Sequence, residues 1–226
     1  MAKNTKTIVG VDEAGKGPVL GPLVMVALAV KEEDQQKLQW LGVKDSKLLS
    51  SEVREELFER IKEIVCDFRI EVIEPDAIDL SVRGENGSNL NWLEAETSAR
   101  MVSELHPDKI ILDCPSTNIS AYRNFFANKL SSGVRDRAEL VVEHKADTNH
   151  IVVAAASIIA KVIRDRSIES IKREVGVDFG SGYPSDPKTQ EFLHNYNDKY
   201  PDLFRRSWKS YIRVEQMKKQ KTLGEF

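Results

Sequence analysis

The chain has 226 residues, of which 41% are hydrophobic and 31% charged, and its formal net charge is −3. This length allows one sizeable core, and the composition is that of an ordinary globular protein. No apolar run approaches the ~20 residues of a membrane helix, and the N-terminus lacks the apolar segment of a signal peptide. The two cysteines, Cys66 and Cys114, give no disulfide framework and no zinc spacing, so we expect a cytoplasmic protein.

The first predicted element is a buried strand near the N-terminus. Ile8, Val9 and Val11 form its apolar run, and it ends on two adjacent carboxylates, Asp12 and Glu13. Glycines and prolines follow at once, at positions 15, 17, 18, 21 and 22. Residues 23–30 are a continuous apolar run, which is typical of a central strand. The short connection between the two strands predicts a hairpin.

The rest of the chain alternates helical and strand patterns. Helices are predicted at residues 32–41, after Ser50 or Ser51 as N-cap, and at 89–105, 119–130, 151–175 and 189–200. Strands are predicted at residues 68–73, 109–113 and 139–143. We expect Pro75 and the turn at residues 84–88 to break the chain. Residues 180–187 are predicted to be a turn-rich loop, and the alanines at 154–156 should bring one helix close to the sheet. The pattern indicates an α/β fold with a mixed sheet.

Acidic residues stand at several predicted strand or loop ends, namely Asp12 with Glu13, Asp113 and Asp147. Taken singly, an aspartate after a strand is most often a turn former, and Asp147 could cap the next helix. Taken together, the acids can converge at one edge of the sheet, where they would repel one another without cations. Two divalent ions would neutralise them and form a site for phosphoryl transfer.

A nucleotide-binding phosphate loop is an alternative interpretation of the same stretch, because Gly10 and Gly15-Lys16 have its spacing. Three features oppose it. Gly17 stands where the loop needs a hydroxyl for magnesium, Asp12 and Glu13 add negative charge, and Pro18 and Pro22 interrupt the helix that should follow. We therefore disfavour a nucleotide hydrolase.

The C-terminal part is basic. Residues 205–221 hold seven Lys or Arg and one acid, Glu215, interleaved with Trp208 and Tyr211. Such a segment suits contacts to phosphates, and a solvated helix face explains it equally well.

Five motifs, taken in their order along the chain, resemble ribonuclease HII of the archaeal type. They are Asp12-Glu-Ala-Gly-Lys-Gly-Pro18, Asp45-Ser-Lys47, His144-Lys-Ala-Asp147, Ala155-Ala-Ser-Ile-Ile-Ala-Lys161 and Gly180-Ser-Gly-Tyr-Pro-Ser-Asp-Pro187. The resemblance implies a ribonuclease H-like fold, with a mixed five-stranded sheet flanked by helices and a small helical C-terminal part. It also implies hydrolysis of RNA paired with DNA and cutting at single ribonucleotides in duplex DNA, which leaves a 3′-hydroxyl and a 5′-phosphate.

The resemblance also assigns roles to individual residues. Asp12, Glu13, Asp113 and Asp147 would be the catalytic acids that bind two Mg²⁺ or Mn²⁺ ions. The backbone of Gly15-Lys16-Gly17 would contact the ribose 2′-hydroxyl, and Tyr183 would detect the RNA–DNA junction. Further substrate contacts are implied for Asp45, Ser46, Lys47, Lys145, Trp208 and Lys209.

The last seven residues look like a sliding-clamp-binding motif, with Gln220, Leu223 and Phe226 at its defining positions. A frayed chain end is the alternative. We expect a catalytic domain at residues 1–204 and a basic segment at 205–226 that ends in an unstructured tail. A monomeric endoribonuclease fits these features best, and a clamp-associated duplex-binding module without activity is the alternative function.

Overall fold

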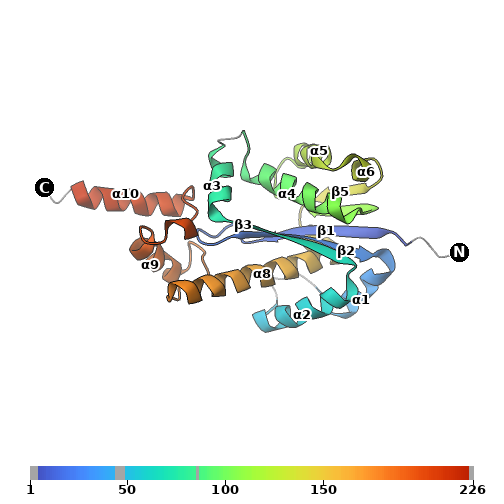
Figure 1. Ribbon diagram of the computed structural model, residues 1–226, viewed down its shortest axis with the longest axis horizontal. Coiled ribbons are helices and arrows are strands. Elements are labelled where there is room, and N and C mark those ends of the chain that lie inside the picture. The colour runs from blue at the N-terminus through green and yellow to red at the C-terminus, as the bar shows by residue number, and fades with distance from the viewer. Residues whose placement is uncertain (1–4, 44–48, 85–86, 224–226) are drawn as a thin grey trace. The chain divides into compact units, whose positions relative to one another are not determined.

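Five strands form one mixed sheet in the part of the chain that the computed structural model describes, residues 5–43, 49–84 and 87–223. Across the sheet their order is β3 (Asp67–Ile73), β2 (Leu23–Lys31), β1 (Thr7–Ala14), β4 (Lys109–Asp113) and β5 (Glu139–Glu143) (Figure 1). β1 runs antiparallel to β2 and parallel to β4, and β5 runs parallel to β4. The expected mixed five-stranded sheet is confirmed.

The chain groups into two compact units, and each gathers segments that are distant in the sequence. The first, which we call the sheet unit, comprises Met1–Ala14, Val24–Val72 and Asn91–Ile163. The second, which we call the loop unit, comprises Gly15–Leu23, Ile73–Leu90 and Arg164–Phe226. We expected a boundary after residue 204. In the structure, residues 164–204 group with the C-terminal helix.

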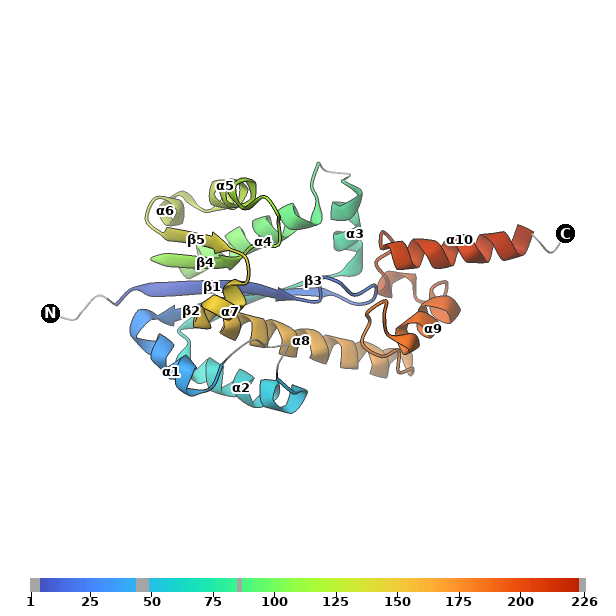
Figure 2. The same cartoon turned by 180° about the vertical axis from the view of Figure 1, so that it is seen from behind.

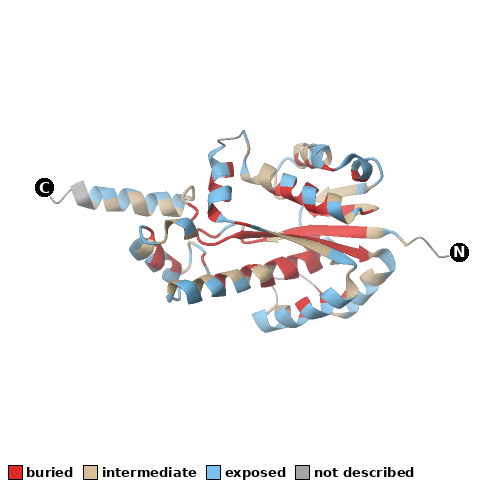
Figure 3. Cartoon of the chain, viewed as in Figure 1, coloured by how far each residue is buried: buried red, intermediate tan, exposed pale blue. Residues whose placement is uncertain are grey.

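The expected hairpin of β1 and β2 lies at the centre of the sheet. Thr7 pairs with Lys31 at one end and Ala14 with Val24 at the other. Figure 3 shows both strands buried along almost their whole length. Side chains on both faces of a central strand enter apolar layers, so the sequence shows a continuous apolar run there and no alternation.

Helices cover both faces of this sheet (Figures 1 and 2). On one face, α1 (Gln35–Trp40), α2 (Ser51–Ile64) and residues 151–163 of α8 (Ile151–Val175) share an apolar cluster with β1, β2 and β4. On the other face lie α4 (Leu90–Leu105) and α5 (Ile119–Lys129). Ser50 caps α2 as expected, since its side chain accepts a hydrogen bond from the amide of Val53. None of the described helices combines the length and the apolar composition that spanning a membrane requires.

Helix α8 approaches β1 closely at Gly10. A Cβ atom at this position would lie 2.6 Å from the carbonyl carbon of Val152, which is nearer than real side chains come. Ala154, Ala155 and Ala156 are buried in the same helix. The short side chains therefore let the helix backbone rest on the strand, as the alanine run predicts.

The loop unit has an apolar core of its own. It contains α3 (Pro75–Arg83), residues 164–175 of α8, α9 (Pro187–Tyr196), the single turn Pro201–Leu203 and α10 (Lys209–Leu223). The ring of Phe192 stacks on that of Tyr196, with centroids 4.9 Å apart. Around these rings lie the buried side chains Val19, Leu20, Ile168, Phe179, Leu193 and Phe204.

Several short or terminal elements differ from the expectation. Pro75 begins α3 and does not simply break the chain, because proline is well suited to the first position of a helix. The short helices α6 (Ser132–Arg135) and α7 (Ala146–Asn149) lie in stretches for which no element was predicted. The C-terminal tail was expected to be unstructured, yet α10 continues through Leu223.

Candidate active site

The first pair of acids lies within β1, just before its end. Asp12 is buried and Glu13 is half-buried, as expected for neighbours that point to opposite faces of a strand. Asp113 is the last residue of β4, and the pair Val11–Leu112 aligns it with Asp12 on the neighbouring strand. Two parallel strands therefore place carboxylates next to each other at their carboxyl ends.

Asp147 lies in the short helix α7, buried, and does not cap the next helix, which begins at Ile151. The chain enters α7 through Lys145, whose φ of 60° is in the left-handed region. This bend lets the amide of Ala146 donate a hydrogen bond of 2.7 Å to Oδ1 of Asp113. The turn after β5 thus fixes the carboxylate at the end of β4.

The charges of these acids act on one another. The pKa of Asp12 is raised from 3.8 to about 7. Burial is the largest cause and the charges of Asp113 and Asp147 add to it, whereas hydrogen bonds from the Ser157 side chain and the Glu13 backbone oppose it. Burial also raises the pKa of Tyr122, with contributions from Glu94, Glu13 and Asp113. The four predicted acids therefore lie in one electrostatic neighbourhood of the sheet unit.

The donor set suits a divalent cation. Carboxylate oxygens are the ligands that hard cations prefer, and excess negative charge around Asp12 is what such an ion would neutralise. As the side chains stand, no three His, Cys, Asp or Glu residues in the described parts of the chain are arranged to hold a metal ion. The acids are neighbours, but in the described structure they do not converge on one ion position.

The phosphate-loop interpretation is wrong. The loop after β1 leads directly into β2, so no helix N-terminus follows it to receive a phosphate. Gly10, the first glycine of that pattern, lies inside β1 beneath α8.

The predicted Gly15-Lys16-Gly17 loop lies in the loop unit, where it packs against the segment before α10. Gly15 has a φ of 90°, and a Cβ atom there would lie 2.8 Å from the carbonyl oxygen of Pro22. The Arg205 guanidinium donates to the carbonyls of Gly15 and Lys16, and the Trp208 indole donates to that of Gly17. The backbone of all three loop residues is therefore held in place.

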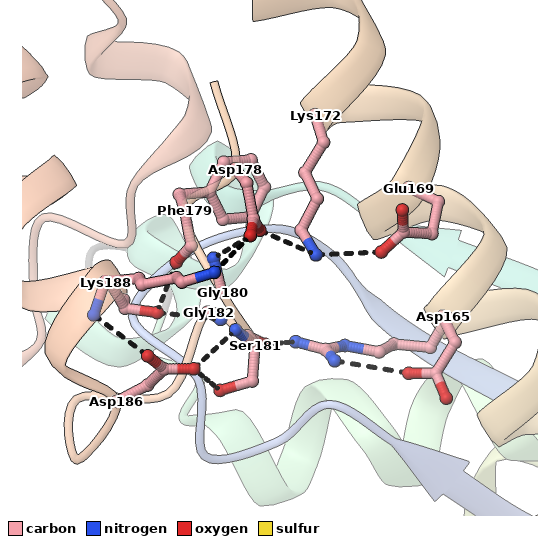
Figure 4. A network of polar contacts seen from close by, with 12 residues as sticks. Asp165, Glu169, Lys172, Asp178, Phe179, Gly180, Ser181, Gly182, Asp186 and Lys188 are labelled. Atoms are coloured by element: carbon pink, nitrogen blue, oxygen red, sulfur yellow. Dashed lines mark hydrogen bonds and ion pairs between the residues drawn. The ribbon is translucent and has the colours of Figure 1, made fainter. Parts of the chain in front are cut away.

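Tyr183 projects from the second predicted loop, with 37% of its surface exposed. Figure 4 shows what orders this loop: Asp186 accepts hydrogen bonds of 2.8 Å from both the amide and the hydroxyl of Ser181. Arg164 donates to the carbonyl of Ser181 at 2.6 Å, and its guanidinium lies 5.5 Å from the centre of the Tyr183 ring. A Cβ atom on Gly17 would lie 3.3 Å from that ring.

The two loops are also joined through their backbones. The carbonyl of Gly182 accepts hydrogen bonds from the amides of Val19 and Leu20, at 2.9 and 3.3 Å. The amide of Gly182 donates to the hydroxyl of Thr189. The predicted ribose-contacting loop and the predicted junction-detecting tyrosine thus belong to one hydrogen-bonded cluster.

Sequence reasoning missed the two buried arginines that hold this cluster. Arg205 was counted among solvent-facing basic residues, yet its side chain is fully buried, and Arg164 was not singled out. The neighbouring Arg206, in contrast, is only half-buried and forms an ion pair of 2.5 Å with Asp76. No local signal separates these arginines from surface ones, because the partners of Arg205 lie up to 190 residues away.

The remaining predicted residues are placed as follows. Lys209 is exposed at the start of α10, Trp208 is half-buried and Lys145 is exposed. Gln220 is exposed on α10, and Leu223 is its last residue. The predicted contacts Asp45, Ser46, Lys47 and Phe226 lie outside the described residues.

Comparisons with known proteins point in one direction. The family model described as Ribonuclease HII matches residues 9–211. The chain is 42% identical to Ribonuclease HII of Pyrococcus abyssi, over 97% of this chain and 96% of that one. It is similar to the crystal structure of ribonuclease H2 from Pyrococcus horikoshii OT3, with a TM-score of 0.82, 38% identity and coverage of 93% and 98%.

A second solved structure is that of the PCNA:RNase HII complex from Archaeoglobus fulgidus. Its similarity to this chain has a TM-score of 0.78 at 38% identity, and the match covers 90% of this chain and 95% of that one. These likenesses confirm the expected ribonuclease H-like fold.

Proposed function

Because the chain belongs to the ribonuclease HII family, whose members are nucleases that degrade the RNA of RNA–DNA hybrids, we propose that it also cuts duplex DNA at single embedded ribonucleotides. The observation that carries this proposal is the set of mutually interacting carboxylates around Asp12. In the reaction, a water oxygen bonds to phosphorus and the bond to the 3′-oxygen breaks. The attacking water loses a proton and the leaving 3′-oxygen takes one up, so the products are a 3′-hydroxyl and a 5′-phosphate.

Asp12, Glu13, Asp113 and Asp147 would hold two divalent ions, Mg²⁺ or Mn²⁺. When bound, such ions supply activation of the attacking water and stabilisation of the leaving 3′-oxygen. The protein keeps Asp113 oriented through the amide of Ala146, and it keeps Asp12 buried so that its charge is poorly screened. These two features suit the carboxylates to a bound cation.

The loop unit would supply selectivity for ribose. The backbone of Gly15-Lys16-Gly17 would meet the 2′-hydroxyl, the group that distinguishes RNA from DNA. Tyr183 would pack against the sugar or base at the RNA–DNA junction. Trp208, Lys209, Lys145 and the segment at residues 45–47 would contact the strands around it, with the basic residues on phosphates.

A labelled duplex that contains one ribonucleotide tests the proposal. With Mg²⁺ or Mn²⁺, we expect one cut on the 5′ side of the ribonucleotide, and a polymerase should extend the new 3′ end without prior repair. The matched all-DNA duplex should stay intact. Cleavage of long hybrids together with intact single-ribonucleotide duplexes would contradict the finer substrate assignment.

The C-terminus would bind a sliding clamp through Gln220, Leu223 and Phe226. Support comes from the complex of the Archaeoglobus fulgidus relative with PCNA and from the exposed position of Gln220 on α10. Calorimetry against the clamp of the same organism should show binding by the intact chain and none by a chain that lacks residues 220–226. Wild-type affinity after replacement of Leu223 and Phe226 by alanine would contradict the motif.

Cytoplasmic location and the monomeric state also remain proposals. Cell fractionation tests the first. Sedimentation velocity tests the second and should give one species near the chain mass of 25.6 kDa.

A further inference from the structure

Among the described residues, Arg205 has the largest fully buried side chain, and it donates hydrogen bonds to main-chain carbonyls of the loop unit. Nη2 donates to Gly15 at 2.6 Å and to Gly21 at 3.0 Å, Nη1 donates to Lys16 at 2.8 Å, and Nε donates to Gly21 at 3.1 Å. Trp208 lies against the same guanidinium, 5.0 Å from its centre. One side chain thus holds the backbone at both ends of residues 15–21, which we call the glycine loop.

These contacts determine which way the loop amides point. In a trans peptide the carbonyl and the next amide point in opposite directions, and no cis peptide occurs among the described residues. The carbonyls of Gly15 and Lys16 face Arg205, so the amides of Lys16 and Gly17 face the other way. Two successive amides that share a direction form a concave donor surface that suits an oxygen ligand.

The shape of the guanidinium matters as much as its charge. Its nitrogens lie in one rigid plane and reach three carbonyls at once, whereas an ammonium group is a single point with rotating donors. A buried charge is tolerated when hydrogen bonds replace its water, and here carbonyls do so. Lysine at this position would keep the charge and lose the simultaneous contacts.

The segment that carries Arg205 is itself anchored. Asp79 on α3 is buried and accepts hydrogen bonds from the amides of Arg206 and Ser207, at 2.7 and 3.0 Å. The amide of Arg205 donates to the carbonyl of Val19 at 2.9 Å. The guanidinium therefore has a fixed origin, and its direction is set by backbone on both sides.

We propose that Arg205 is a positioning residue that gives this enzyme its selectivity for ribose, by aiming the amides of Lys16 and Gly17 at the 2′-hydroxyl. The inference rests on the proposed function of the glycine loop. Arg205 itself touches neither the substrate nor the reacting phosphate. Its substitution should consequently affect the recognition of one hydroxyl group and spare general duplex binding.

The test compares Arg205→Lys with Arg100→Lys, the same chemical change at an exposed ion pair with Glu71. For each protein, dissociation constants are measured with divalent ions chelated, for a duplex with one ribonucleotide and for the same duplex without it. Cleavage of the first duplex is then measured with Mg²⁺. We expect Arg205→Lys to lower kcat/KM about 10- to 100-fold, as small displacements of positioned groups do. The preference for the ribonucleotide duplex should vanish, and all-DNA binding should stay within about two-fold. Arg100→Lys should match wild type.

Each other outcome has a definite meaning. If wild type leaves the ribonucleotide duplex intact, the proposed function fails before Arg205 is at issue. If wild type cuts and Arg205→Lys keeps its preference, only the inference about Arg205 is overturned. Equal weakening of both duplexes would assign Arg205 to folding alone.

A measurement on wild type covers the case in which Arg205→Lys does not fold. In ¹⁵N NMR the Arg205 side-chain nitrogens should give separate, slowly exchanging signals, because carbonyls restrain the guanidinium. Adding the ribonucleotide duplex should shift these signals more than adding the all-DNA duplex does. Identical shifts with both duplexes would overturn the proposal.

Discussion

The two units treat buried charge in opposite ways. In the sheet unit, like charges are gathered: Asp12 is buried near Asp113 and Asp147, and its pKa is raised to about 7. In the loop unit, the buried guanidinium of Arg205 is matched by main-chain carbonyls, among them those of Gly15 and Lys16. The first arrangement disfavours the ionised form of Asp12, whereas in the second the charge is compensated by hydrogen bonds within the protein. The two units therefore contribute to the stability of the chain in different ways.

The largest effect should follow removal of one carboxylate. Asp12→Asn, Glu13→Gln, Asp113→Asn and Asp147→Asn should each lower activity about 100-fold or more, the scale of losing one electrostatic stabiliser. Melting temperatures without metal should hold or rise, because a repulsion is removed. Single-turnover cleavage at saturating Mg²⁺ and thermal denaturation measure the two effects. Near-normal turnover of the Asp113 and Asp147 variants would contradict a four-carboxylate site.

The stability of the folded protein should depend on pH through Asp12, whose pKa is raised mainly by burial and to a smaller extent by the neighbouring charges. The native state holds the Asp12 proton more tightly than the unfolded chain does. The resulting stabilisation is therefore complete below pH 3.8 and is lost as the pH rises through about 7. The shift corresponds to up to about 4 kcal/mol. Urea unfolding without metal should show this fall, which Asp12→Asn should abolish and Mg²⁺ should oppose. An unchanged slope in Asp12→Asn would assign the pH dependence to other groups.

Replacing Asp79 tests how much the buried hydrogen bonds of the loop unit contribute to stability. Asp79→Ala leaves the amides of Arg206 and Ser207 without their carboxylate and should lower the free energy of unfolding by about 3 kcal/mol. Asp76 is the matched control, since it lies on the same helix in an exposed pair with Arg206. Its replacement by alanine should cost less than about 1 kcal/mol. Equal losses in urea unfolding would remove the distinction between buried and exposed partners.

Tyr183→Ala should harm selectivity more than general binding. Loss of a ring that stacks on a base or sugar costs about 1–3 kcal/mol, whereas phosphate contacts carry most of the affinity. Cleavage of a junction substrate should fall, and binding to an uncleavable DNA duplex should hold. Tyr183→Phe, which keeps the ring, should stay close to wild type. If alanine weakens both properties equally, Tyr183 is structural only.

The smallest effect is expected at Lys145, whose left-handed backbone strains any residue with a Cβ. Lys145→Gly and Lys145→Ala remove the same charge, so both should weaken duplex binding by similar amounts. The glycine variant should be more stable by about 1 kcal/mol or less, because glycine relieves the backbone strain but increases the conformational entropy of the unfolded chain. Comparing the melting temperatures of Lys145→Gly and Lys145→Ala measures the cost of the Cβ in this backbone conformation. A less stable glycine variant would show that the conformation carries no strain.

Sequence patterns correctly predicted features that depend on neighbouring residues, such as strand bounds and a helix cap. β4 and β5 have the predicted bounds, because short apolar runs between turns leave few alternatives, and Ser50 caps its helix as a serine should. Asp113 was correctly placed at a strand end for the same reason. Only the alternative interpretation of Asp147 as a helix cap is wrong, because the sequence gives no signal that Lys145 takes a left-handed conformation and starts α7. Pro75 was taken as a breaker, although proline also opens helices.

Tertiary contacts were beyond the reach of such patterns. The sequence places Arg205 in a basic segment, and only the fold shows it inside, on carbonyls of the first loop. The pKa of Asp12 depends on Asp113 and Asp147, which lie more than 100 residues away along the chain. Roles carried by several distant residues require the three-dimensional arrangement, whereas the residue types alone suffice to nominate the acids.

The clamp of Arg205 on the glycine loop also sets an order of events during synthesis. A ribosome makes about 5–20 residues per second and releases the N-terminus first, so the 190 residues between Gly15 and Arg205 take about 10–40 s to appear. Throughout that interval the loop exists without the side chain that shapes it. A nascent chain can therefore begin to build its sheet, but the proposed selectivity for ribose requires that Arg205 has already been made.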